Sequence, residues 1–128
     1  MFPEDLRYTK DHEWIRVLGD RGIVGITDYA QNQLGDVVFV ELPEAGRAMN
    51  AGQSFGSVES VKAVSELFSP VTGDIVETNK ALVSAPEVVN SDPYGKGWML
   101  VVKLQAPAEL AGLMDASAYA AFVQTEGK

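Results

Sequence analysis

Residues 56–70 read GSVESVKAVSELFSP, with one lysine near the middle. Their apolar residues recur close to the spacing of an amphipathic helix, at Val58, Val61, Val64 and Phe68. The charged residues near the opposite face are Glu59, Lys62 and Glu66. No Gly, Asn or Asp marks a tight hairpin turn between Ser60 and Ala63. The local pattern alone therefore predicts a helix, on which Lys62 is one solvated lysine among acids.

The segments on either side favour short β-strands. Runs rich in Val, Ile and aromatic residues, separated by Gly and Pro, cover residues 14–18, 22–27, 36–42, 74–78 and 98–104. Short runs of this kind, interrupted by turn residues, are typical of a small sandwich or barrel. In residues 37–40 both alternate faces are apolar, so we expect this strand to be buried on two sides.

Two further segments favour helices. The first begins at an N-cap, Thr27, and stops before Gly35. The second is C-terminal and covers about residues 115–124, with Asp115 as its cap. The apolar side of this second helix carries Tyr119, Phe122 and Val123. We expect the last residues, 125–128, to be frayed.

The composition fits one domain and excludes several kinds of chemistry. The 128 residues, of which 46% are hydrophobic, are enough to bury a core of their own. The chain has no Cys and one His, so disulfides, thiol nucleophiles and transition-metal sites are not expected. The sequence has no phosphate-binding glycine loop, and no nucleophile motif accompanies His12. An enzyme is therefore poorly supported.

Charge and hydropathy argue against two classes of partner. There are 18 Asp and Glu against 10 Lys and Arg, which gives a net charge of −8 and disfavours nucleic acid and anionic membranes. No apolar run approaches the roughly 20 residues of a membrane helix. The N-terminus does not resemble a presequence. We therefore expect a cytoplasmic, bacterial-like protein.

Five motifs follow one another along nearly the whole chain. They are His12-Glu13-Trp14; Gly25-Ile26-Thr27-Asp28-Tyr29-Ala30-Gln31 followed by Leu34-Gly35-Asp36; Val38-Phe39-Val40-Glu41-Leu42-Pro43; Glu59-Ser60-Val61-Lys62-Ala63; and Pro93-Tyr94-Gly95-Lys96-Gly97-Trp98-Met99. In this order and at this spacing, the chain closely resembles the H-protein family of the glycine cleavage system, whose members carry a lipoyl group. Each motif is weak alone, and the match is specific because all five occur together.

The resemblance implies a mainly β fold of the lipoyl-domain type. This fold is a hybrid barrel-sandwich of two small antiparallel sheets with short helices, one of them C-terminal. Residues 1–128 would form a single lipoyl-carrier domain. Lys62 would lie at the tip of a β-hairpin rather than on a helix, and glycines flank the motif at Gly56 and Gly73. A packed sandwich holds such a tip rigidly and projects it into solvent.

The resemblance also implies a carrier and not an enzyme. Lipoate would be bound covalently, through an amide on the side-chain nitrogen of Lys62, by a lipoate-attaching enzyme. The carrier would then shuttle the aminomethyl group from the pyridoxal-phosphate glycine decarboxylase (the P protein) to the aminomethyltransferase (the T protein). Dihydrolipoyl dehydrogenase (the L protein) would reoxidise it. No catalytic residue and no metal ligand is implied in this chain.

Three acids match positions of the family. Glu59 would contribute to recognition by the lipoate-attaching enzyme, and a solvated turn residue is the equally weighted alternative. Glu13 and Glu66 would line a cleft into which the loaded arm folds back. A carboxylate suits this cleft because it can hold a protonated amine in a charge-assisted hydrogen bond. The alternative for both acids is ordinary surface charge.

Other carriers and a non-carrier remain as alternatives. A biotinyl carrier is disfavoured because Val61 and Ala63, rather than Met, flank the lysine. A lipoyl relay, which donates lipoate to 2-oxoacid dehydrogenase complexes, would need the same Lys62 and Glu59. An interaction domain whose hairpin lysine stays unmodified is the non-carrier alternative.

Overall fold

The computed structural model describes residues 2–126, which form two antiparallel sheets. The six-stranded sheet has the order β1 (Arg7–Tyr8), β2 (Glu13–Leu18), β3 (Arg21–Ile26), β9 (Leu100–Leu104), β8 (Gly73–Thr78) and β5 (Ala48–Met49). The three-stranded sheet has the order β4 (Val37–Glu41), β6 (Ser54–Ser60) and β7 (Val64–Phe68). Among the described strands, neither sheet closes into a barrel. The mainly β fold with two antiparallel sheets is confirmed.

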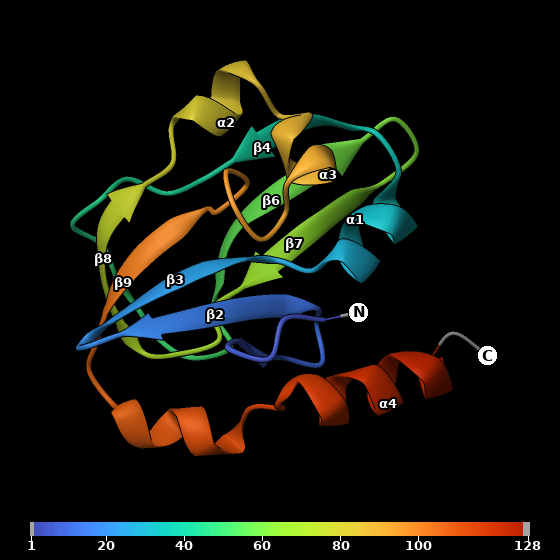
Figure 1. Ribbon diagram of the computed structural model, residues 1–128. Helices are drawn as coiled ribbons and strands as arrows, with labels where there is room; N and C mark the ends of the chain where they lie inside the picture. The colour runs from blue at the N-terminus through green and yellow to red at the C-terminus, as the bar shows by residue number, and fades with distance from the viewer. Residues whose placement is uncertain (1, 127–128) are drawn as a thin grey trace.

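Short helices connect and flank these strands (Figure 1). They are α1 (Asp28–Leu34), α2 (Ala81–Ser84), α3 (Val88–Ser91), a 3-10 helix (Pro107–Gly112) and the C-terminal α4 (Ala116–Glu126). Helix α1 lies at the side of the β6–β7 hairpin, and α4 runs beneath β2. Among residues 2–126, no helix has both the length and the apolar character that a bilayer crossing requires.

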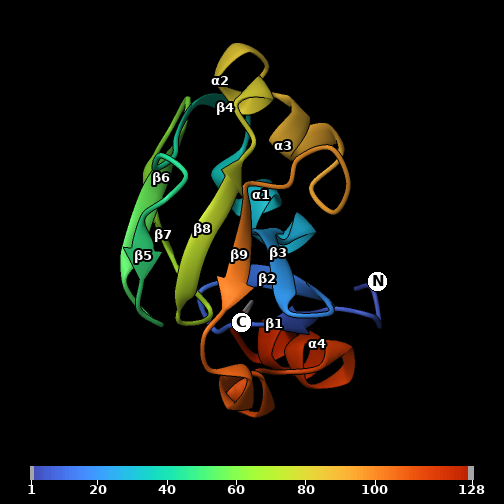
Figure 2. The ribbon, with the colours of Figure 1, turned by 90° about the vertical axis from the view of Figure 1, so that its left-hand side faces the viewer.

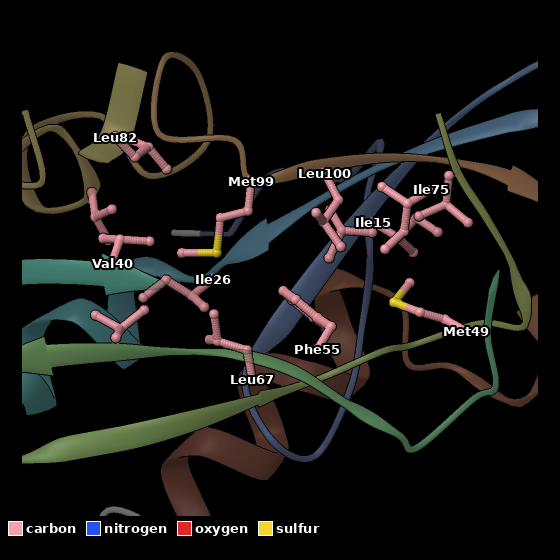
Figure 3. Close-up of a cluster of buried hydrophobic side chains, with 14 of the residues drawn as sticks. Ile15, Ile26, Val40, Met49, Phe55, Leu67, Ile75, Leu82, Met99 and Leu100 are labelled. Atoms are coloured by element: carbon pink, nitrogen blue, oxygen red, sulfur yellow. The ribbon is translucent and has the colours of Figure 1, made fainter. Parts of the chain in front are cut away.

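The core fills the space between the two sheets, which are seen edge-on in Figure 2. Figure 3 shows side chains from the two layers pointing toward one another. Ile15, Ile75 and Leu100 come from the six-stranded sheet, whereas Phe55 and Leu67 come from the three-stranded sheet. Successive residues of a strand point to opposite faces of its sheet, and the inward-facing apolar side chains of the two sheets interdigitate. This packing gives the β6–β7 hairpin a rigid base.

The prediction that residues 37–40 are buried on two sides is wrong. Val37 and Val40 are 3% and 1% exposed, but Val38 and Phe39 are 49% and 47% exposed. The pairing of β4 with β6 shifts between Val37 and Phe39, which marks a β-bulge. A bulge inserts one extra residue and breaks the strict alternation of faces. Two consecutive apolar side chains therefore face outward.

Helix α1 confirms the predicted signals at both ends. The Thr27 side chain accepts a hydrogen bond from the Ala30 amide (3.1 Å), as an N-cap does. Gly35 ends the helix with a φ of +79° and a ψ of −157°, in a region open essentially to glycine.

Helix α4 begins where predicted and runs two residues further. The Asp115 carboxylate accepts a hydrogen bond from the Ala118 amide (2.8 Å). The helix continues to Glu126, so the expected fraying is wrong for residues 125–126, and residues 127–128 lie outside the described residues. The Tyr119 ring stacks on Tyr8, with 4.6 Å between ring centroids. This stacking fixes α4 against the first strand.

Candidate functional site

Residues 56–68 form a hairpin and not a helix, so the local prediction is wrong and the implied hairpin is confirmed. Strands β6 and β7 pair antiparallel, with Val58 opposite Ser65 and Glu59 opposite Val64. Strand β6 ends at Ser60 and β7 begins at Val64, so the tip consists of Val61, Lys62 and Ala63.

The turn is made by a serine hydroxyl in place of a special turn residue. The Ser60 amide donates to the Ala63 carbonyl (2.7 Å). The Ser60 hydroxyl oxygen accepts hydrogen bonds from the amides of Lys62 (3.3 Å) and Ala63 (3.1 Å). Serine is known to close turns through such bonds. Ser60 is the residue that sequence reasoning missed, and its place immediately before the turn was the available signal.

A second contact fixes the tip to the rest of the fold. The Val61 amide donates to the Asp36 carbonyl (3.1 Å), just after α1. The Lys62 side chain is exposed, and a Cβ placed on Gly35 would lie 3.5 Å from Lys62 Cε. The apolar stem of the lysine thus passes over the end of α1. Within residues 2–126, Lys62 forms no ion pair.

A cavity of about 260 Å³ lies beside this helix end. It is lined by α1, by strand β7, by the start of β2 and by the end of α4. The two acids expected in a cleft, Glu13 and Glu66, both line it, and so does Leu34, next to Gly35. Glu59 does not; it lies exposed on β6 opposite Phe39. The structure therefore brings together two of the three predicted acids and places Lys62 near the same cavity.

Glu13 is buried, at 1% exposure, so surface charge is the wrong interpretation for this residue. One carboxyl oxygen accepts a hydrogen bond from the Thr9 hydroxyl (2.6 Å), and the other accepts from the Phe68 amide (3.1 Å). Glu13 on β2 is thereby bonded to β7 of the other sheet. Burial raises the pKa of Glu13 to about 7, although both hydrogen bonds favour the ionised form.

Glu66 lies in a different environment. Its side chain is exposed, and one carboxylate oxygen accepts a hydrogen bond from the Ser54 hydroxyl (3.0 Å). One acid of the cavity, Glu13, is therefore buried and has a pKa close to neutral pH, while the other, Glu66, is exposed to solvent.

The buried carboxyl predicts a pH dependence of stability. Because the pKa of Glu13 is about 7 in the folded chain, against an ordinary value of 4.5, the folded state holds a proton that the unfolded state has lost. The protonated Glu13 carboxyl makes its full contribution to the free energy of unfolding below about pH 4.5. This contribution, about 3 kcal/mol, is lost as the pH rises to about 7.

Glu13→Gln is expected to remove this loss, since the amide stays neutral. Denaturant unfolding of both proteins from pH 4.5 to pH 8 checks the prediction. From pH 4.5 to pH 8, the free energy of unfolding of the variant should rise by about 3 kcal/mol relative to that of the unsubstituted chain. A difference that stays constant with pH would contradict it.

Comparison with known proteins identifies the family. The sequence profile described as Glycine cleavage H-protein matches residues 6–126. The chain belongs to the glycine cleavage H-protein family. Relatives described as glycine cleavage system H protein include one from Symbiobacterium thermophilum, 60% identical over 122 residues, which cover 95% of each chain. Another, from Anaeromyxobacter sp. (strain K), is 56% identical over 124 residues, which cover 97% of each chain.

A solved structure shows that the family resemblance extends to the fold. The crystal structure of a glycine cleavage system H protein from Mycobacterium marinum superposes with a TM-score of 0.86 at 44% identity. The match covers 99% of this chain and 100% of that chain. The arrangement of sheets and helices described above is therefore that of the H-protein family.

Proposed function

We propose that this chain, as a single domain of residues 1–128, is the lipoyl carrier of a glycine cleavage system and catalyses no step itself. Lys62 carries lipoate through an amide on Nζ. The carrier takes the aminomethyl group from the P protein to the T protein and is reoxidised by the L protein. We place it in the cytoplasm of a bacterium, in keeping with its bacterial relatives.

The observation that carries this proposal is the position of Lys62. It stands at the tip of a two-stranded hairpin, exposed and, within the described residues, outside every ion pair. The turn hydrogen bonds of Ser60 and Val61 fix its backbone. A modifying enzyme can therefore reach the lysine nitrogen while the attachment point stays rigid. The site fits a covalent acyl group on these grounds.

When bound, the lipoyl group supplies two sulfur atoms to a chain that has no Cys. The chain's own residues provide a place for the arm, because the stem of Lys62 already lies over Gly35, beside the cavity. Glu13 and Glu66 would hold a protonated amine there. A positive charge beside Glu13 favours its ionised form, so this carboxyl would release its proton as the amine enters.

Glu59 is proposed as part of the surface that the lipoate-attaching enzyme recognises. It is exposed, and it lies opposite Val64 at the base of the turn, near Lys62. This position supports a recognition role, because an enzyme that holds the lysine nitrogen must lie against the neighbouring strand ends.

Intact mass tests the proposal. The chain is incubated with a lipoate ligase, ATP and lipoate, and the modified residue is located by peptide mapping. Addition of one lipoyl group, at Lys62, is expected, and aminomethyl loading by the P protein is then the next assay. No addition to the folded chain would overturn the carrier function and leave an interaction domain.

A further inference from the structure

Exposed apolar side chains gather around Lys62. Val61 in the turn is 71% exposed and Val64 at the start of β7 is 66% exposed. On β4, the bulge turns both Val38 and Phe39 outward. These four residues, Val38, Phe39, Val61 and Val64, are called the tip patch below.

Strand pairing relates two members of the tip patch to each other through Glu59. Phe39 lies opposite Glu59, and Glu59 lies opposite Val64, so the three residues form one row across the sheet. Residues paired in this way point to the same face, with neighbouring Cβ atoms about 5 Å apart. Val61 is held next to β4 by its hydrogen bond to the Asp36 carbonyl. Phe39 and Val64 therefore lie on one face of the three-stranded sheet with Glu59 between them, and Val61 lies beside Lys62 in the turn.

The rim of the tip patch is acidic. Its exposed carboxylates belong to Asp36, Glu41 and Glu66, while the exposed carboxylate of Glu59 lies within the patch, between Phe39 and Val64. None of the four forms an ion pair with another of the residues 2–126. An apolar patch that contains one unpaired carboxylate and is bordered by three more is complementary to an apolar surface that carries Lys and Arg.

We propose that the tip patch is the docking surface for the enzyme that acylates Lys62, and this proposal rests on the proposed function. The occupant presents an apolar surface with a basic rim. The acylating enzyme must bring the lysine nitrogen itself into its active site, so it covers the residues around Lys62. Partners that act on the loaded arm meet its far end and have no such need.

The test compares lipoylation kinetics of two double variants with those of the unsubstituted chain. Phe39→Thr with Val64→Thr removes apolar surface from the patch while keeping residues that favour strands. Val17→Thr with Leu18→Thr makes a similar change at exposed positions of β2, on the other sheet. A lipoate ligase with ATP and lipoate is the probe, and thermal unfolding confirms that each variant is folded.

The patch variant is expected to raise the KM for the carrier about tenfold, because a desolvated Val or Phe contact is lost. Its kcat should change less than twofold, and the β2 variant should match the unsubstituted chain. Added salt should raise the KM of the unsubstituted chain, since the rim attracts a basic surface. Val64→Thr alone should give a smaller rise in KM. This single variant provides the test if the double variant does not fold.

Each contrary outcome has a distinct meaning. Equal KM values for the patch variant and the unsubstituted chain overturn the docking proposal and leave the carrier function intact. An equal rise in both double variants also overturns it, because the effect is then not local. Absence of lipoylation in the unsubstituted chain overturns the proposed function and the docking proposal together.

Discussion

Replacing Lys62 with arginine is expected to abolish lipoylation under conditions that fully modify the unsubstituted chain. A guanidinium remains protonated near neutral pH and offers no amine to an acyl group, whereas the lysine side chain ends in a primary amine that can form an amide. The turn should survive the change, because its hydrogen bonds come from the backbone and from the Ser60 hydroxyl. Lys62→Arg should therefore keep its stability within about 0.5 kcal/mol.

Lys80→Arg is the matched control, because Lys80 is also exposed and lies outside the hairpin. Intact mass should show one lipoyl group on the control and none on Lys62→Arg. A lipoyl group on Lys62→Arg, or its loss from Lys80→Arg, would show that another lysine is the attachment site.

Replacing Gly56 with alanine is expected to cause a large loss of stability. A Cβ at this position would overlap the backbone carbonyl oxygen of Glu41 on the neighbouring strand, so the backbone must shift. The register of β6 against β7 also shifts here, between Ser54 and Gly56. Overpacking of this kind costs about 1–3 kcal/mol, and the upper value, expected for an overlap with backbone, corresponds to a fall in Tm of about 10 °C.

Gly112→Ala is the control for this prediction. A Cβ on Gly112 would meet no atom within 4 Å, and its φ is not in the left-handed region. The control should retain or slightly increase its stability, because alanine restricts the unfolded chain. Thermal unfolding compares the two variants, and equal Tm values would contradict the close approach of β6 to β4.

Signals confined to a few neighbouring residues were sufficient to predict the helices. The cap at Thr27 and the glycine at Gly35 define α1 through local hydrogen bonding and backbone conformation. The same holds for Asp115 at the start of α4. These features depend on residues within one turn of each other, so they can be recognised before the fold is known.

The hairpin could not be predicted from local spacing. Val58, Val61 and Val64 recur every three residues, as on a helix, yet only Val58 enters the core. Its burial depends on the opposite sheet, which a local window does not contain. The outward turn of Val38 likewise depends on a bulge against β6. The family resemblance predicted the hairpin, because the fold of the family includes the contacts between the two sheets.

The candidate site was predicted in part. The sequence placed Glu13 and Glu66 in one cleft through the resemblance, and both line the cavity. It did not predict that Glu13 is buried and bonded to Phe68 of the other sheet. From the sequence alone, a glutamate beside Trp14 at the start of a strand is expected to be an exposed polar residue. Only the packing of two sheets shows that its carboxyl is dehydrated.

The fixed turn at Lys62 has a consequence for how tightly the cavity needs to bind. A group attached there would encounter the cavity at an effective concentration set by its own arm, which for short flexible tethers is in the millimolar range. A dissociation constant of about 1 mM, or roughly −4 kcal/mol, would then keep the arm docked about half the time. Weak retention of this kind implies rapid release, since low affinity arises mainly from fast dissociation. A cavity that binds weakly would therefore be sufficient to hold an attached group for about half the time without trapping it.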